Sequence, residues 1–245
     1  MSAPDTPDSG VPSPSPTSMA SRLDAIRDRM ARACARAGRP ASDVILLPVS
    51  KTFGVDAVRE AQALGLHRFG ENKTQEIAQK APVVVDPTPE WVMIGHLQTN
   101  KAKDAARLVA EVQSLDRLDL ARALDRRLQH EGRAIDVLIQ VKTSPEPSKF
   151  GLAPEELPGF LKQLGHFDTL RVKGLMTMAV NANEEQPVRA CFRMLRGWRD
   201  RLRDNGAEGL ARLSMGMSGD FELAIEEGST EVRIGSALFG QRVYH

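Results

Sequence analysis

The chain has 245 residues, of which 41% are hydrophobic, and this is enough for one barrel-sized domain or two small ones. Its 33 Lys and Arg residues nearly balance 32 Asp and Glu residues, and a net charge of +1 gives no reason to expect a nucleic acid or an anionic membrane as a partner. Neither Cys34 nor Cys191 belongs to a metal-binding or C-x-x-C cluster, so we expect reduced thiols, no metal site and a cytoplasmic location.

Residues 1–18 consist almost wholly of Ser, Pro, Asp, Thr, Gly and Ala, which bury too little apolar area to offset the entropy cost of ordering. We therefore predict a disordered tail, with neither a secretory signal nor a membrane span, followed by one domain over residues 19–245. From Ser21 apolar residues recur at three- and four-residue spacing, which predicts an amphipathic helix that ends at Gly38.

After this helix, short apolar strands alternate with amphipathic helices, a pattern that is typical of a parallel sheet built from βα units. The predicted strands are 44–50, 67–70, 91–95, 111–114, 136–142, 172–178, 212–215 and 231–235. Helices are predicted between them, among others at 55–64, 117–130, 155–164 and 184–203. Eight such units indicate an α/β protein, a single (β/α)8 TIM barrel with an extra N-terminal helix.

Lys51 directly follows the first apolar strand and is the most informative residue of the chain. A (β/α)8 barrel carries its active site on the loops that leave the carboxyl ends of its strands. An amine placed there is partly desolvated, which lowers its pKa and allows it to form a Schiff base with an aldehyde. The plainer alternative is a strand-end lysine whose ammonium extends to water.

Barrel closure places the first strand beside the last, so Lys51 should neighbour the residues that end the eighth strand. These include Arg233, and then Gly235 and Ser236 at the start of what the sequence indicates is a short helix. Backbone N–H groups and a hydroxyl at a helix start are suited to phosphate. The preceding loop adds glycines and Ser218, which can also donate to an anion.

This set of residues matches the requirements of pyridoxal phosphate. The aldehyde would bond Lys51, the phosphate would lie near Ser218, Gly235 and Ser236, and Arg233 could hydrogen-bond the pyridine nitrogen. Because arginine stays charged, it would keep that nitrogen unprotonated and weaken the ring as an electron sink. The set therefore favours holding the cofactor, or only modest carbanion chemistry.

Several short segments together carry a resemblance to a known family. They are 49–52 (VSKT), 69–72 (FGEN), Trp91 with 94–95 and 97–101 (LQTNK), 148–149 with Gly151, 174–176 (GLM), 213–218 (LSMGMS) and 232–235 (VRIG). Through them the chain resembles the pyridoxal phosphate homeostasis proteins, also called the YggS or PROSC family, which are related to the N-terminal barrel of alanine racemase. The resemblance runs from about residue 21 to residue 242, nearly everything except the tail.

The resemblance implies a barrel with pyridoxal phosphate bound to Lys51, phosphate contacts from Ser218, Gly235 and Ser236, and no established catalytic turnover. It implies a role in intracellular storage, buffering or delivery of the cofactor. Candidate partners are the cofactor and apoenzymes that require it, with no nucleic acid and no membrane. Two departures are small: His96 stands where proline is more usual, and Ser236 replaces threonine but keeps the hydroxyl.

Further residues are expected around the ring. Asn72 could reach the ring or its 3-hydroxyl, or instead cap the next helix. His96 could face the pocket or be an ordinary loop imidazole, and Lys149 could be a second amine that accepts the aldehyde during transfer. Four methionines are expected to pack around the ring: Met176, Met178, Met215 and Met217.

Two enzymatic alternatives use the same lysine. A racemase of the alanine-racemase type needs a second acid or base on the opposite face of the substrate, supplied in that relative by a tyrosine from another domain. The one tyrosine of this chain, Tyr244, stands at its end, and no second domain is indicated. A Schiff-base aldolase would leave Arg233 without a role. We therefore expect a non-catalytic carrier, and a monomer because no segment marks a large apolar interface.

Overall fold

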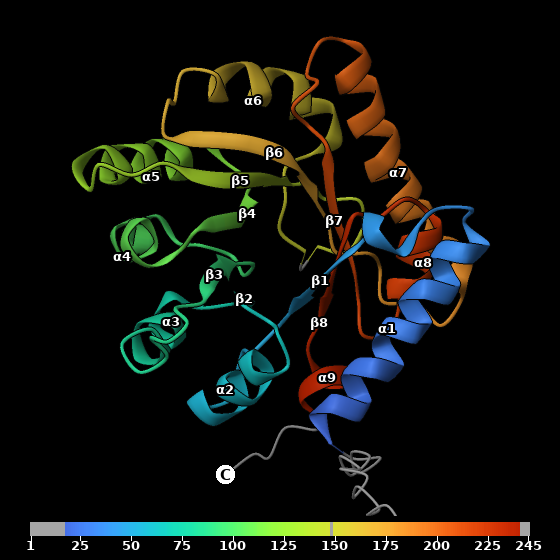
Figure 1. Cartoon of the computed structure of the whole chain (residues 1–245). Coiled ribbons are helices and arrows are strands. Elements are labelled where there is room, and N and C mark those ends of the chain that lie inside the picture. Colours follow the sequence, from blue (N-terminus) through green and yellow to red (C-terminus); the bar gives the residue numbers. More distant parts are fainter. Residues whose placement is uncertain (1–17, 148, 241–245) are drawn as a thin grey trace, which may run out of the picture.

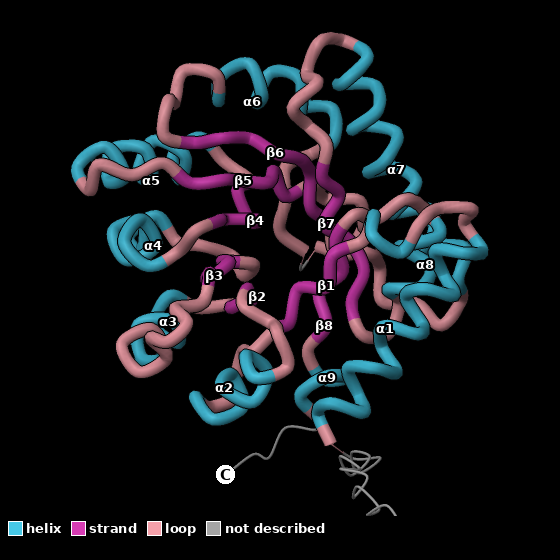
Figure 2. The backbone as a smooth tube through the Cα atoms, viewed as in Figure 1, coloured by secondary structure: helices cyan, strands magenta, loops and turns pink. Residues whose placement is uncertain are grey.

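The computed structural model describes residues 18–147 and 149–240. Eight parallel strands form the centre and helices surround them, so the predicted α/β fold, a (β/α)8 TIM barrel, is confirmed (Figures 1 and 2). Apart from Ser18, the tail predicted to be disordered lies outside the described residues, and so does Tyr244. Within the described part of the chain, no helix combines the length and the apolar character that crossing a membrane requires.

Each predicted strand is present within a few residues of its expected bounds. The strands are β1 (Ile45–Pro48), β2 (Arg68–Glu71), β3 (Glu90–Met93), β4 (Glu111–Leu115), β5 (Ile135–Gln140), β6 (Leu170–Met176), β7 (Arg212–Met217) and β8 (Glu231–Ile234). Sheet neighbours follow the order β1-β8-β7-β6-β5-β4-β3-β2, and a bridge between Val49 and Gly70 closes the barrel. Leu47 of β1 pairs with Arg233 of β8, as the closure argument predicted.

The helices lie on the outside of the barrel and begin and end close to their predicted positions (Figure 2). They are α1 (Met19–Arg36), α2 (Val55–Ala63), α3 (Thr74–Lys80), α4 (Ala102–Leu108), α5 (Leu118–His130), α6 (Leu157–Leu164), α7 (Glu185–Asp204), α8 (Phe221–Glu226) and α9 (Ser236–Phe239), with 3-10 turns at Ala41–Asp43, Thr99–Lys101 and Pro154–Glu156. The extra helix α1 is confirmed and lies against α8 and α9 (Figure 1).

Helix α1 holds the elements that follow β7 and β8 in place. Ser18 caps its first turn by accepting a hydrogen bond from the backbone N–H of Ser21 at 3.1 Å. Its apolar face, which includes Leu23, is buried in the core, and each such side chain stabilises the fold by about 1.5–3 kcal/mol. Arg29 forms an ion pair with Glu222 of α8 at 2.7 Å. This packing fixes the helices that carry the loops around the candidate site.

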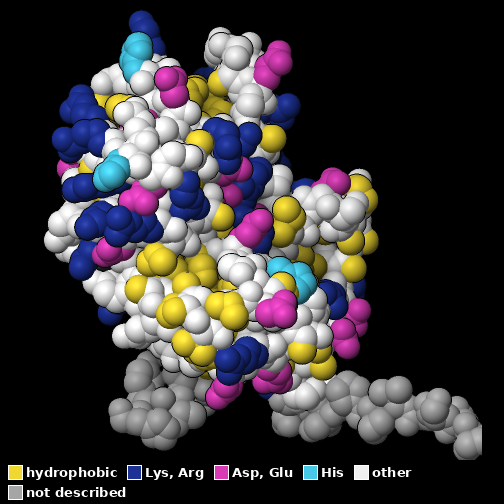
Figure 3. Space-filling view, turned by 60° about the vertical axis from the view of Figure 1, so that its left-hand side comes forward, with side chains coloured by type: hydrophobic (Ala, Val, Ile, Leu, Met, Phe, Trp, Pro, Cys, Tyr) yellow, Lys and Arg dark blue, Asp and Glu magenta, His cyan; other side chains and the backbone are white. Residues whose placement is uncertain are grey.

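The state of the two cysteines and the charge of the surface agree with the predictions from composition. Cys34 and Cys191 are buried free thiols, as predicted. On the face shown in Figure 3, basic side chains gather toward the upper left of the view and hydrophobic ones toward the lower part, and acidic side chains are scattered over the whole face. This mixed surface fits a net charge close to zero.

Candidate functional site

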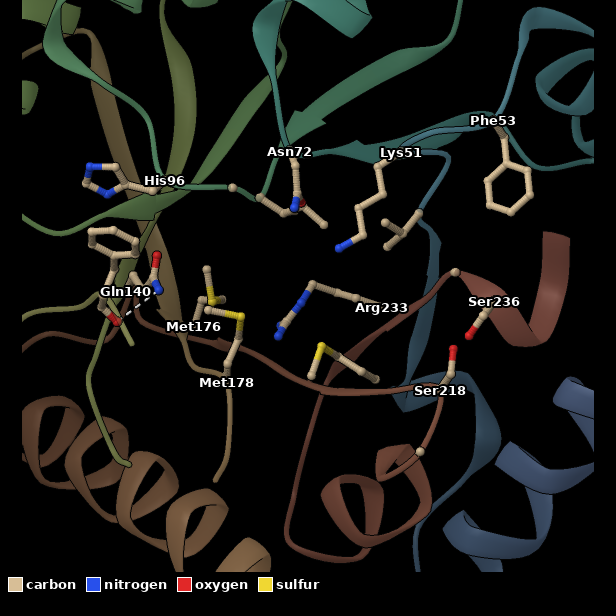
Figure 4. Close-up of a pocket in the computed structure, with 17 residues that line it drawn as sticks. Lys51, Phe53, Asn72, His96, Gln140, Met176, Met178, Ser218, Arg233 and Ser236 are labelled. Carbon is tan, nitrogen blue, oxygen red and sulfur yellow. Dashed lines mark hydrogen bonds between the residues drawn. The ribbon is translucent and has the colours of Figure 1, made fainter. Parts of the chain in front are cut away.

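A cavity of about 500 Å³ opens at the carboxyl end of the barrel, where this fold places its active sites. Strand-end loops from both halves of the barrel line it (Figure 4). Six of the predicted site residues are brought together there: Lys51, Asn72, Ser218, Arg233, Gly235 and Ser236. They come from β1, β2, β7 and β8, which are neighbours in the closed sheet.

Lys51 extends from the end of β1 into this cavity (Figure 4). The next residue, Thr52, has φ of 68°, in the left-handed region that a β-branched residue rarely adopts. Its backbone N–H donates to Glu76 Oε2 of α3 at 2.7 Å, which holds the chain in this turn. A strained turn of this kind persists only where the surroundings impose it, and here it sets the direction of the Lys51 side chain.

A buried ion pair fixes the backbone on the other side of Lys51. Glu71, at the end of β2, accepts hydrogen bonds from Ser50 Oγ and Lys80 Nζ, each at 2.6 Å. Lys80 Nζ also donates to the backbone carbonyl of Ser50 at 2.9 Å. Burial raises the pKa of Glu71, and the hydrogen bonds and charge of Lys80 counteract only part of this effect. The sequence analysis missed this pair, although Thr74, Ile77 and Lys80 recur every three residues on the buried face of α3.

The loops after β7 and β8 form an anion cradle. Ser218 Oγ accepts a hydrogen bond from the backbone N–H of Ala237 at 3.4 Å, which connects the two loops. The hydroxyl groups of Ser218 and Ser236 face one another (Figure 4). No atom lies within 4 Å of the place where a Cβ at Gly219 would stand, so its backbone is open to the cavity. Helix α9 begins at Ser236, next to this cradle, and the start of a helix favours an anion.

Arg233 extends from β8 into the cavity next to Lys51, with its guanidinium pointing away from the cradle serines (Figure 4), and this group is held at both ends. Its Nη1 donates to Ser214 Oγ and its Nη2 to the backbone carbonyl of Thr177, both at 2.8 Å. Burial lowers the pKa of Arg233, against the attraction of Glu231 and Asp220. An arginine nevertheless keeps its proton in a protein, so a fixed positive charge faces the cavity.

Asn72 points into the cavity beside Lys51 (Figure 4). The alternative, in which its side chain caps the next helix, is not what the structure shows, because Lys73 occupies the N-cap of α3 without a side-chain cap bond. Gly95 allows this arrangement, since a Cβ there would overlap the backbone of Asn72.

Two predicted site residues lie elsewhere. Met215 is fully buried in the core, because its neighbour Ser214 faces the barrel interior and successive side chains of a strand point to opposite faces. The prediction that Met215 packs around the ring is therefore wrong, whereas the other three predicted methionines, Met176, Met178 and Met217, line the cavity. Lys149 is not among the lining residues; its Nζ donates to the carbonyl of Ala179 at 2.7 Å and lies 3.5 Å from Glu146 Oε2.

An aromatic pair that the sequence analysis did not predict forms part of the cavity wall. The imidazole of His96 stacks on Phe150, with ring centroids 3.9 Å apart. Gln140 fixes the loop that carries Phe150, because its Nε2 donates to the Phe150 carbonyl at 3.0 Å (Figure 4). The sequence signal was limited to the position of Phe150 next to Lys149 in the loop after β5.

The barrel, the strand-end lysine and the anion cradle define a class of protein, and comparisons identify it. The family model of the alanine racemase N-terminal domain matches residues 21–243. An alanine racemase of Clostridium difficile, 14% identical with a TM-score of 0.76 over 92% of this chain and 58% of that chain, shows the shared fold.

Nearer relatives narrow this class. A pyridoxal phosphate homeostasis protein of Aquifex aeolicus is 42% identical over 223 residues, 91% of this chain and 98% of that protein. PipY of Synechococcus elongatus, solved with PLP bound, is 35% identical with a TM-score of 0.81, over 91% of this chain and 100% of PipY. The chain belongs to the pyridoxal phosphate homeostasis protein family.

Proposed function

We propose that the protein binds pyridoxal phosphate without catalysing a reaction of its own and stores, buffers or delivers the cofactor. One observation carries this proposal: Lys51, Arg233 and the two cradle serines, Ser218 and Ser236, line the same cavity. The names of the relatives and the PLP bound to PipY support it.

The residues of the cavity fit the parts of this cofactor. Pyridoxal phosphate, when bound, supplies an aldehyde that an amine can capture reversibly. Lys51 provides that amine, and Ser218 and Ser236 provide hydroxyl donors for the phosphate. The Gly219 backbone is open to an anion. Arg233 presents a donor to the pyridine nitrogen and Asn72 presents an amide to the ring, so each polar part of the cofactor meets a group of suitable chemistry.

Arg233 also supports a role in holding the cofactor rather than in catalysis. Its permanent charge keeps a neighbouring pyridine nitrogen unprotonated, which reduces the ability of the ring to stabilise a carbanion. In this proposal the protein acts in the cytoplasm as a monomer and passes the cofactor to apoenzymes that require it. Incubating the cofactor-loaded protein with L-alanine should give no D-alanine above the rate of a Lys51→Ala control, and sustained turnover would contradict the non-catalytic role.

Lys149 has a proposed part in the release of the cofactor, as a second amine that accepts the aldehyde. Its Nζ is held by the Ala179 carbonyl on the loop after β6. We expect Lys149→Ala to slow both cofactor release and transfer to an acceptor apoenzyme, with binding at Lys51 retained. Lys142→Ala, in the same loop, is the control. Unchanged release and transfer in Lys149→Ala would remove this part of the proposal.

Absorbance gives the basic test of binding. The protein mixed with pyridoxal phosphate should acquire the visible absorbance of a lysine-bound cofactor, and Lys51→Ala should not. Arg233→Lys keeps a positive charge but loses the planar donor pair, so we expect it to bind more weakly with a changed spectrum. A protein that stays colourless in excess cofactor would contradict the proposal.

A further inference from the structure

A chain of hydrogen bonds runs through the barrel interior and ends at Arg233. It begins at two carboxylates near the amino end, Glu111 and Glu231, which both accept hydrogen bonds from the Nε2 group of Gln113. Arg68 and Arg212 hold these carboxylates; Arg212 Nη2 is 2.7 Å from Glu231 Oε2, and Arg68 Nη2 is 3.1 Å from Glu111 Oε2. The hydrogen-bond series therefore starts at two carboxylates that arginine side chains hold in place.

The carboxylates determine the order of donors and acceptors in this hydrogen-bond series. Both N–H bonds of the Gln113 amide are used toward them, so its Oε1 must face the other way, where it accepts from Ser214 Oγ at 2.7 Å. A hydroxyl has one proton, and Ser214 donates it to Gln113. The Ser214 oxygen can therefore only accept from Arg233, whose Nη1 lies 2.8 Å away. The reversed amide would place Oε1 against two negative charges.

The middle of this hydrogen-bond series is separate from the cavity. Gln113 and Ser214 are each 0% exposed, and neither is among the residues that line the cavity. Arg233 is 4% exposed and is the member that reaches it. Hydrogen bonds in such a dry interior are strong and directional, so the orientation set at the carboxylates is transmitted to the guanidinium.

We propose that Gln113 and Ser214 are positioning residues for Arg233, and that they form a one-directional hydrogen-bond relay from Glu111 and Glu231 which aims the guanidinium at the cavity. The effect of this guanidinium orientation on a bound cofactor rests on the proposed function. The orientation of Arg233 itself does not, since every bond of the relay lies within the protein.

The first experiment reads Arg233 directly in the cofactor-free protein. NMR of arginine side chains labelled with ¹⁵N, assigned with Arg233→Lys, should show resolved Nη signals for a guanidinium whose rotation is hindered. Ser214→Ala should broaden or merge these signals. Ser229→Ala is the matched control: Ser229 is also 0% exposed, and its hydroxyl contacts the backbone carbonyls of Leu213, Met215 and Glu231 at 2.8–3.3 Å but hydrogen-bonds to no side chain of the relay. The control should leave the Arg233 signals unchanged.

A second variant keeps the test decisive if Ser214→Ala does not fold. Gln113 hydrogen-bonds to Glu111, Glu231 and Ser214 and not to Arg233. Gln113→Met keeps a similar shape and frees the Ser214 hydroxyl to turn its proton away from the glutamine site. The relay predicts that Gln113→Met also broadens the Arg233 signals. Freely rotating Arg233 in the unmodified protein, or signals unchanged in the folded variants, would overturn the proposal.

The cofactor-loaded protein gives the functional readout. A guanidinium that has turned from the ring no longer opposes protonation of the bound chromophore. The midpoint of its absorbance titration should therefore rise by about 0.5 pH unit or more in Ser214→Ala and Gln113→Met, but not in Ser229→Ala. An unmodified protein that never acquires the absorbance would refute the proposed function, while the NMR experiment would still decide the relay. Unshifted midpoints in both variants would refute the link between relay and cofactor.

Discussion

At the scale of residues, the direction of a side chain matters as much as its type, and two methionines of β7 show this. Met215 is buried in the core and Met217 is 37% exposed and lines the cavity. Met215→Ala should lower the free energy of unfolding by about 2–5 kcal/mol, because it leaves a cavity in the core. Met217→Ala should change it by less than about 1 kcal/mol but weaken cofactor binding.

Chemical unfolding of the cofactor-free proteins and titration with pyridoxal phosphate measure the two effects separately. Because both variants carry the same substitution two residues apart, each is the control for the other. A similar loss of stability in both would mean that the two side chains do not differ in burial as the structure shows.

The buried pair of Glu71 and Lys80 predicts a second residue-scale effect. Lys80 is 5% exposed, and Lys80→Met leaves the Glu71 carboxylate buried without its cation, which should lower the free energy of unfolding by about 3–5 kcal/mol near neutral pH. Lys73→Met, at an exposed position just before α3, is the control and should change it by less than about 0.5 kcal/mol. Urea unfolding of the cofactor-free protein measures both.

The same pair gives a pH dependence with a definite sign. Burial raises the pKa of Glu71 in the folded protein, so the folded state holds this proton more strongly than the unfolded state does. Stability is therefore lost as pH rises from the ordinary carboxyl pKa to the raised one. Lys80→Met should raise the pKa of Glu71 in the folded protein further. The loss in free energy of unfolding that this substitution causes should therefore be smaller at about pH 5 than at about pH 8. Adding Glu71→Gln should remove this difference between the two pH values. A loss of unfolding free energy in Lys80→Met that does not depend on pH would contradict the account.

At the scale of elements, α1 is expected to support the cradle, because it packs on α8 and α9. Leu23→Ala, at a position 1% exposed, should lower the free energy of unfolding by about 2–5 kcal/mol. It should also weaken binding of the cofactor phosphate, since α9 begins at Ser236. The exposed Arg27→Ala should change neither quantity appreciably. Thermal unfolding and competition by inorganic phosphate measure these effects, and a destabilised Leu23→Ala protein with normal phosphate affinity would separate α1 from the site.

The strands also show how much of the fold could be predicted from the sequence. Apolar runs separated by amphipathic helices were enough for all eight strands, and closure of the barrel correctly paired the strand before Lys51 with the strand that carries Arg233. The sequence could not predict that Met217 differs from Met215 in burial, because β7 continues through Gly216, which has φ of 98°, and its register with β8 shifts between Ser214 and Met217. A simple alternation within the shorter predicted strand could not reveal this.

At the scale of the whole molecule, the two ends of the barrel have different roles. Ion pairs of Arg68 and Arg212 with Glu111 and Glu231 fill the interior toward the amino end, and the carboxyl end opens into the cavity. Contacts such as Gln113 with Glu231 join residues 118 positions apart, so they depend on the closed barrel. No local sequence pattern specifies them, which is why the relay toward Arg233 emerged only from the structure.

Covalent trapping tests the central claim most directly. Reduction of the cofactor-loaded protein with borohydride, followed by peptide mapping with mass spectrometry, should place the cofactor on Lys51. Lys149→Ala should keep this label and Lys51→Arg should lose it. A label found mainly on Lys149 or on another lysine of the unmodified protein, or no label at all, would contradict the account.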